Sequence, residues 1–254
     1  MQETIKARLT ELERQYSVKI LFACETGSRA WGFPSPDSDY DVRIIYKHDL
    51  DWYLSLADRD DTIEYMSKNG ELDITGWDIK KCLQLMWKSN GALLERVQSP
   101  IVYSEEAGMA EAMKSYAFRC FSPIATMHHY LGMAKKSFAE VERRSETKLK
   151  RLFYALRAAL ACKWITDKGT PPPIVFMAMV NELHFDARLK ARIIELIDLK
   201  SGKSERYLHP AEHDLNDFIT AEIMAADKVF NTLPGRKEKE VELDNFFAEV
   251  VKAR

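Results

Sequence analysis

The feature that most constrains the fold is a short segment near the N-terminus that joins a buried strand to a glycine-serine turn. Residues 18–24 (VKILFAC) form an apolar run bounded by turn residues, which is typical of a buried strand. Gly27 then permits a tight turn, and Ser28 can cap a short helix that follows. This order predicts a strand–turn–helix unit whose unpaired backbone N–H groups can bind an anion.

Two aspartates follow on the next predicted strand. Asp39 and Asp41 are two residues apart, so their side chains point to the same face of an extended segment. Adjacent carboxylates in an apolar element repel each other unless a cation lies between them, and hard oxygen ligands suit Mg²⁺ or Mn²⁺. Asp73, framed by apolar residues on a later predicted strand, is a candidate third ligand. Three such carboxylates beside a phosphate-binding turn suit two-metal phosphoryl or nucleotidyl transfer.

Each part of this pattern also has an ordinary structural interpretation. A glycine-serine pair is a simple turn in most proteins, and an Asp-x-Asp in a polar loop is usually solvated or caps a helix. Asp37 shares the spacing of Asp39 and Asp41 but follows Pro36 directly, which favours a role in closing the turn. The alternative for Asp73 is a surface position on an edge strand. The joint order of strand, turn and strand favours the metal-binding interpretation.

The same residues resemble a known family. Residues 25–32 (ETGSRAWG) and 38–43 (SDYDVR) are similar to the DNA polymerase β-type nucleotidyltransferases, and more narrowly to a subfamily predicted to act in RNA repair beside an RNA ligase. The similarity extends to residues 73–81 (DITGWDIKK), to residues 88–90 (KSN) and to a helix with Lys150, Tyr154 and Arg157. Gly91 departs from the subfamily pattern, which has a proline after the Lys-Ser-Asn segment.

The resemblance implies an enzyme that moves a nucleoside monophosphate from an NTP to a hydroxyl acceptor and releases pyrophosphate. It implies Mg²⁺ (or Mn²⁺) on the catalytic residues Asp39, Asp41 and Asp73. The residues implied to bind the nucleotide are Gly27, Ser28, Arg29, Lys150, Tyr154 and Arg157. RNA ends, a protein side chain and a small alcohol are all open as acceptors, and the subfamily favours RNA. Two other classes are also open: an inactive nucleotide-binding regulatory module and an antitoxin-like interaction protein on the same fold.

The residues of the basic helix support this assignment only in part. Lys150, Tyr154 and Arg157 fall at helical spacing on one face, and residues 135–157 hold eight basic against three acidic side chains. Such a face can bind phosphates and stack a base, but a solvated helix with exposed charges has the same pattern. His209 and His213 are four residues apart and compatible with zinc, but no cysteine is near, so we expect a surface position.

The composition is consistent with a cytoplasmic enzyme. The chain has 254 residues of which 46% are apolar, enough for one large domain or two small ones. No segment fits a signal peptide or a membrane span, so we expect no membrane partner. The net charge of −2 leaves nucleic-acid binding to local patches. Four widely spaced cysteines are expected to be buried in a reducing compartment: Cys24, Cys82, Cys120 and Cys162.

The predicted elements change in character along the chain. The first part combines an N-terminal helix, short strands with a hairpin at residues 69–70, and a helix over 78–98 that is interrupted near Asn90. The rest is helical, with helices over 111–132, 133–141, 148–164, 176–185, 187–199, 213–230 and 237–252. We therefore expect an α+β, polymerase-β-like nucleotidyltransferase domain with a mixed sheet at residues 1–104. A helical domain that completes the nucleotide site is expected at residues 105–254.

Overall fold

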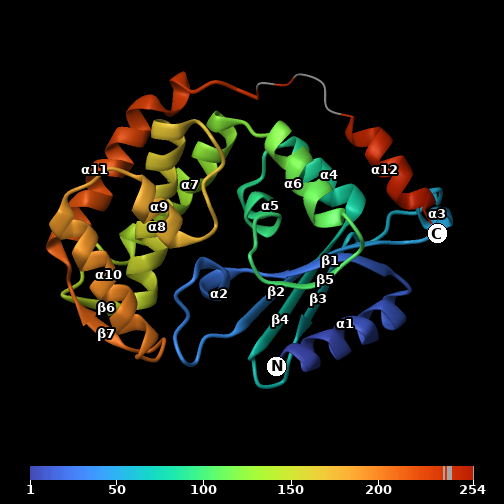
Figure 1. The fold of residues 1–254 in the computed structure, drawn as a ribbon, viewed down its shortest axis with the longest axis horizontal. Helices are drawn as coiled ribbons and strands as arrows, with labels where there is room; N and C mark the ends of the chain where they lie inside the picture. The colour runs from blue at the N-terminus through green and yellow to red at the C-terminus, as the bar shows by residue number, and fades with distance from the viewer. Residues whose placement is uncertain (237, 239–241, 254) are drawn as a thin grey trace. The chain divides into compact units, whose positions relative to one another are not determined.

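A computed structural model of the chain describes residues 1–236, 238 and 242–253 (Figure 1). Strands and helices are mixed along the chain, which confirms the predicted α+β class. The contacts divide the chain into two compact units. Unit 1 consists of Met1–Gly27, Asp39–Cys120 and Glu238–Arg254, and unit 2 consists of Ser28–Ser38 and Phe121–Lys237. This grouping joins residues 105–120 to the first unit and residues 28–38 to the second, whereas the sequence suggested one boundary at residue 104.

Unit 1 is built on a five-stranded mixed sheet with the order β3-β4-β2-β1-β5. Strands β2 and β4 are parallel, and the other neighbouring strands are antiparallel. The predicted hairpin between β3 and β4 is confirmed, with Gly70 at a φ of 74° in its turn. The strands are β1 (Lys19–Glu25), β2 (Tyr40–Lys47), β3 (Thr62–Met66), β4 (Leu72–Asp78) and β5 (Val102–Glu105).

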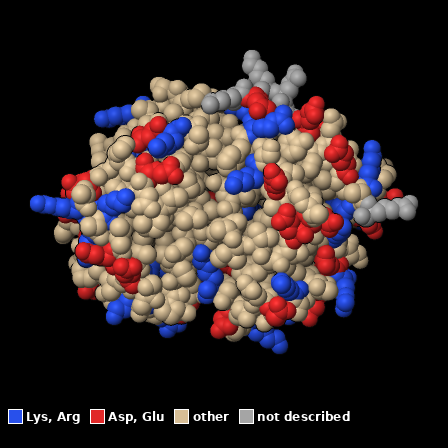
Figure 2. Space-filling view, in the orientation of Figure 1, with Lys and Arg blue, Asp and Glu red and all other residues tan. Residues whose placement is uncertain are grey.

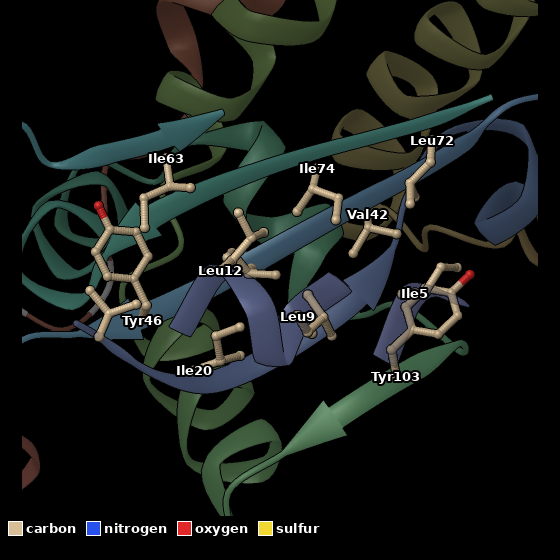
Figure 3. Packing of buried hydrophobic residues seen from close by; sticks show 13 residues of the cluster. Ile5, Leu9, Leu12, Ile20, Val42, Tyr46, Ile63, Leu72, Ile74 and Tyr103 are labelled. Atoms are coloured by element: carbon tan, nitrogen blue, oxygen red, sulfur yellow. The ribbon is translucent and has the colours of Figure 1, made fainter. Parts of the chain in front are cut away.

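One face of this sheet is covered by α1 (Gln2–Tyr16), whose Ile5, Leu9 and Leu12 are buried (Figure 3). They pack with Val42 and Ile74 and with other alternate residues of the strands. The opposite face carries three further helices (Figure 1): α4 (Ile79–Trp87), α5 (Gly91–Arg96) and α6 (Met109–Arg119). Residues that alternate with the α1-facing core therefore point toward this second layer.

The predicted interruption of the helix over residues 78–98 is confirmed. Helix α4 ends at Trp87, Ser89 adopts a left-handed φ of 55°, and the Asn90 side chain accepts a hydrogen bond from the Leu93 N–H to begin α5.

The remaining helices of unit 1 are α3 (Leu50–Tyr53) and α12 (Leu243–Lys252). The Lys47 ammonium donates to the carbonyl oxygens of Val250 and Ala253 at 2.9 and 2.5 Å and so attaches α12. Residues 237 and 239–241 of the predicted tail helix lie outside the described residues.

Unit 2 is mainly helical. Helices α7 (Pro123–Ala139), α8 (Leu149–Lys168) and α11 (His213–Val229) pack together. Helices α9 (Phe176–Glu182) and α10 (Ala187–Ser201) lie between α8 and α11 in the sequence, and a 3-10 turn at Phe230–Thr232 follows α11. The prediction of one helix over residues 111–132 was wrong, because Ser122 caps a new helix with Pro123 at its first position. A small antiparallel sheet of β6 (Glu146–Lys148) and β7 (Leu208–Pro210) was not predicted. Strands of three residues leave little periodic signal.

Charged side chains of both signs are interspersed over the face shown in Figure 2. This mixture agrees with the small net charge of −2. In the part of the chain that the structure describes, no helix is long and apolar enough to cross a bilayer.

Candidate functional site

Two of the three predicted metal ligands lie side by side near the starts of two inner strands of the unit 1 sheet. Asp41 on β2 is the register partner of Asp73 on the parallel strand β4, and neighbouring strands lie about 4.8 Å apart. Both alternate with core residues that face α1, so both point toward the opposite layer. Their side chains are 23% and 25% exposed. Asp39 lies directly before β2 and is half-buried.

The carboxylates of Asp41 and Asp73 share an arginine that the sequence analysis did not include in the site. Arg43 Nη2 lies 3.0 Å from Asp41 Oδ1 and 2.9 Å from Asp73 Oδ2. Arg43 is two residues beyond Asp41 on β2, so a strand places the three side chains on one face. This spacing in the Asp-x-Asp-x-Arg sequence was the signal that would have predicted the contact.

The main chain of Asp41 is fixed by the end of β1. The Thr26 N–H and hydroxyl donate to the Asp41 carbonyl oxygen at 2.8 and 3.0 Å, and the Asp41 N–H donates to Glu25 Oε1 at 2.7 Å. The other Glu25 oxygen accepts from the Tyr103 hydroxyl. These bonds leave little freedom for the backbone that carries the aspartate, which favours a preorganised site.

Gly27 is required at its position by Asp41. Its φ is 62°, in the left-handed region, and a Cβ built on it would lie 2.3 Å from Asp41 Oδ2. In the sequence, the tight turn was the one structural reason for a glycine at this position. The structure adds that the carboxylate occupies the space of the missing side chain.

Ser28 and Arg29, which were predicted to bind the nucleotide, form bonds with the far end of their own loop in unit 2. The Ser28 hydroxyl donates to Ser38 Oγ at 3.1 Å, and Arg29 Nη2 donates to the Ser38 carbonyl oxygen at 2.6 Å. This loop contains α2 (Gly27–Trp31). The bonds close the loop, and nucleotide binding by Ser28 and Arg29 stays a prediction.

Aromatic side chains of the same loop pack onto α8. Trp31 contacts Tyr154 edge-on with the ring centroids 4.9 Å apart, and Phe33 lies 4.9 Å from Phe153. Arg157 places its guanidinium over the Trp31 ring at 4.5 Å and is only 1% exposed. Packing thus accounts for the position of Trp31. The predicted nucleotide contact of Arg157 remains untested, although its side chain belongs to the core of unit 2.

Unit 2 contains a weakly basic pocket of about 600 Å³, lined by four basic and three acidic residues. Two predicted nucleotide-binding residues, Lys150 and Tyr154, belong to it. Lys150 Nζ lies 2.7 Å from Glu205 Oε2, and Arg151 forms an ion pair with Glu140 at 2.6 Å. The lining residues are Asp37, Ser137, Glu140, Lys148, Lys150, Arg151, Tyr154, Glu205 and Arg206. A pocket with several cations and an aromatic ring can bind a phosphorylated ligand.

Glu205 is a pocket residue that the sequence analysis missed. Its second carboxylate oxygen accepts from the Ser38 hydroxyl at 2.8 Å, and its N–H donates to Asp37 Oδ1 at 2.8 Å. Asp37 was expected to close the turn after Pro36, but its side chain instead accepts from the main chain of the distant Glu205, and the turn has a bond from the Ser38 N–H to the Ser35 carbonyl oxygen. No local pattern marks Glu205, because its partner Lys150 lies 55 positions away in the sequence.

Three buried ionisable groups of unit 1, Arg96, Cys24 and Cys82, do not change protonation state near neutral pH. Arg96 of α5 stacks its guanidinium on Trp77 at 3.2 Å, and burial lowers its pKa to about 10, so it remains a cation at neutral pH. Burial raises the pKa of the Cys24 and Cys82 thiols to about 12, which keeps both neutral. All four cysteines are buried and unpaired as disulfides, as predicted.

The donor chemistry fits a hard divalent cation, because Asp41 and Asp73 present carboxylate oxygens from two fixed strands. Among the described residues, however, no three of His, Cys, Asp and Glu are grouped closely enough to hold a metal ion. The site of three carboxylates therefore stays a prediction.

The predicted surface position of His209 was wrong. The residue is only 6% exposed, and its Nε2 lies 2.6 Å from Glu212 Oε1.

Comparison with known proteins places the chain among its relatives. The model of the RNA repair pathway DNA polymerase beta family (RlaP) matches residues 1–249. The "Uncharacterized protein YcgL" of Bacillus subtilis (strain 168) is 42% identical over 223 residues, which cover 88% of this chain and 85% of that protein. A nucleotidyltransferase-like protein from Exiguobacterium sibiricum aligns with 12% identity and a TM-score of 0.31, over 96% of this chain and 79% of that structure. On the extent of the family match and the identity to the Bacillus protein, the chain belongs to the RNA repair pathway DNA polymerase beta family.

Proposed function

We propose that this protein is a metal-dependent nucleotidyltransferase that moves a nucleoside monophosphate from an NTP to a hydroxyl acceptor. The observation that carries the proposal is the in-register pair of Asp41 and Asp73 on parallel strands, beside a turn where Gly27 leaves room only for the carboxylate. Paired carboxylates on rigid strands favour cation-assisted phosphoryl chemistry. Family membership supports the same reaction class.

Each aspartate has a distinct part in the proposed reaction. A bound Mg²⁺ or Mn²⁺ would supply Lewis-acid activation of the acceptor hydroxyl and neutralise charge on the departing pyrophosphate. Asp39 and Asp41 would bind the metal ion that contacts the triphosphate. Asp73 would orient the acceptor hydroxyl and help to accept its proton. The hydroxyl oxygen then forms a bond with the α-phosphorus while the bond to pyrophosphate breaks.

The nucleotide phosphates are assigned to residues with N–H, hydroxyl or cationic groups. Gly27, Ser28 and Arg29 would contact them at the turn, where a missing side chain permits close approach. Lys150, Tyr154 and Arg157 form the second proposed set, supported by the basic pocket that Lys150 and Tyr154 line. RNA is the proposed acceptor, and its support is the description of the family.

The proposal is tested by incubating the protein with each α-labelled NTP, Mg²⁺ and either total RNA or cellular protein. We expect label in the RNA fraction, and loss of at least about a thousandfold of the rate in Asp39→Asn and Asp41→Asn. Asp58→Asn, at an exposed position away from the strands, is the matched control and should keep the wild-type rate. Turnover within tenfold of wild type in both strand variants would refute the metal assignment.

Asp73→Asn separates the acceptor side from the nucleotide side. This variant should lose transfer but still bind Mg²⁺·NTP, because Asp39 and Asp41 retain the proposed contact with the triphosphate. Calorimetric titration with a non-transferable NTP analogue measures this binding. Loss of binding equal to that of Asp41→Asn would show that Asp73 serves the nucleotide instead.

A further inference from the structure

The Arg43 guanidinium contacts both of the carboxylates, Asp41 and Asp73, that would hold a metal ion in the proposed function. Its Nη2 contacts Asp41 Oδ1 at 3.0 Å and Asp73 Oδ2 at 2.9 Å. Its Nη1 donates to the carbonyl oxygens of Val42 at 3.0 Å and Asp73 at 3.4 Å. A single cationic group is therefore bonded to both carboxylates and to the backbone of both strands.

This bridge has an electrostatic reason. Side chains in register on neighbouring strands bring two negative charges together, and like charges directly opposite one another are destabilising. The Arg43 side chain is 18% exposed, so water screens the group only in part. Arg43 thus neutralises one of the two charges in the absence of any ligand. A divalent cation that binds the same oxygens must repel the guanidinium or displace it.

We propose that Arg43 is a built-in counter-ion, which leaves the carboxylates when a metal ion binds and pairs instead with the phosphates of the incoming nucleotide. This inference rests on the proposed function, because it needs both a metal ion and an NTP. The triphosphate supplies the negative charge with which a displaced guanidinium can form charge-assisted bonds. Metal ion alone then binds weakly, and each ligand raises the affinity for the other.

The decisive variant is Arg43→Gln, which keeps a hydrogen-bonding side chain but removes the charge. The affinity for Mn²⁺ without nucleotide, measured by electron paramagnetic resonance of free Mn²⁺, should rise about tenfold, because the metal no longer displaces a cation. The affinity for Mg²⁺ with AMPCPP, measured by calorimetry, should fall about tenfold, because the phosphates lose a partner. If Arg43 only stabilised the fold, Arg43→Gln would weaken both affinities.

Two further variants keep the test interpretable. Arg43→Lys retains the charge and should bind nucleotide-free Mn²⁺ within about threefold of wild type, which separates charge from damage to the fold. Arg8→Gln removes an arginine from α1, where it pairs with Glu11, and should leave both affinities unchanged. Thermal melting in EDTA shows whether each variant is folded.

The outcomes distinguish this inference from the function on which it rests. Opposite changes in the two affinities for Arg43→Gln, with Arg43→Lys near wild type, support the counter-ion. If Asp41→Asn loses Mn²⁺ but Arg43→Gln binds it like wild type or more weakly, the metal site stands and the counter-ion is overturned. If Asp41→Asn binds Mn²⁺ and Mg²⁺·AMPCPP as wild type does, the metal site fails and the inference fails with it.

Discussion

The acidic strands of unit 1 and the basic pocket of unit 2 are held in place in different ways. Asp41, Arg43 and Asp73 stand on two parallel strands, so backbone hydrogen bonds fix their spacing. Lys150 instead depends on a side-chain pair with Glu205, which lies 55 residues away on a loop between α10 and β7. A site on strands is positioned by the sheet, whereas a site of long side chains is positioned by its partners. A substitution that moves a side chain of the first region should therefore have a large effect, because the strands cannot adjust to it, whereas substitutions in the second region should act by charge.

The largest effect expected from this comparison is that of Gly27→Ala. The new methyl group would lie 2.3 Å from Asp41 Oδ2, closer than atoms can approach, so the Asp41 carboxylate must move away from its present position. A displacement of about 1 Å in a catalytic group can cost about a hundredfold in rate, and we expect at least that loss of nucleotidyl transfer. The measurement is single-turnover transfer from an α-labelled NTP.

Gly70→Ala is the matched control for this prediction. Gly70 also has a positive φ, 74°, but a Cβ there meets nothing within 4 Å. Its cost should be about 1 kcal/mol of stability from the left-handed backbone, with the rate unchanged. Equal losses of rate in the two variants would show that backbone strain, and not the collision with Asp41, explains the effect.

The charge of the unit 2 pocket gives the next largest effect. Lys150→Ala should weaken NTP binding by about tenfold to a hundredfold, the value of one charge-assisted bond to phosphate. Glu205→Gln should act in the opposite direction and strengthen phosphate binding by severalfold, because the carboxylate 2.7 Å from Lys150 competes with the ligand. Fluorescence titration with a labelled ATP analogue measures both affinities.

Lys136→Ala is the control, since Lys136 is an exposed lysine of α7 that does not line the pocket. It should leave NTP affinity unchanged. The assignment of the pocket to nucleotide is contradicted if Lys150→Ala binds like Lys136→Ala. If Glu205→Gln weakens binding as much as Lys150→Ala does, Glu205 holds the lysine in place and does not compete with the phosphates.

The difference between the two regions also explains what the sequence could predict. The strand that carries Asp41, the hairpin at Gly70 and the interruption before α5 depend on neighbours in sequence, so local pattern was sufficient for them, although the strand begins at Tyr40 and leaves Asp39 directly before it. The pairing of Asp41 with Asp73 required only the assumption of adjacent strands, which the parallel register confirms. Arg43 was missed although its spacing from Asp41 places both side chains on one face of β2, because the sequence does not show that Asp73 of the neighbouring strand lies within reach of the same guanidinium.

The basic face of α8 shows where local pattern failed. Lys150, Tyr154 and Arg157 share helical spacing, and the sequence treated the three as one surface. In the structure Lys150 and Tyr154 line the pocket, whereas Arg157 is buried over Trp31, a residue 126 positions earlier in the chain. Helical spacing predicts a shared face but gives no depth of burial, because burial depends on what the rest of the chain packs against that face. Glu205 was unpredictable for the same reason.

The smallest effect concerns Asp78, which lies on the same strand as Asp73 but outside the proposed site. Asp78 is fully buried, caps α4 by accepting from the Lys80 N–H at 2.8 Å, and accepts from the Tyr53 hydroxyl at 2.8 Å. Burial raises the pKa of this carboxyl above its usual value, so desolvation outweighs the bonds that favour the ionised form. The two bonds end on different carboxylate oxygens. Asparagine keeps the helix cap through its one amide oxygen, and its NH₂ group can donate to the Tyr53 hydroxyl oxygen in place of the second bond, without a charge.

Asp78→Asn should therefore keep full activity and raise the stability of unit 1 at pH 7 by no more than about 1 kcal/mol. A raised pKa means that the folded protein binds the proton more tightly than the unfolded chain, so the wild type gains stability as pH falls through that pKa. The variant does not titrate there, and its advantage should shrink over the same range. Urea unfolding at pH 7 and at about pH 4.5 measures both differences. A variant that is less stable at pH 7, or whose advantage grows as pH falls, would show that the ionised carboxylate stabilises this end of the strand, and that charge as well as backbone positions residues in unit 1.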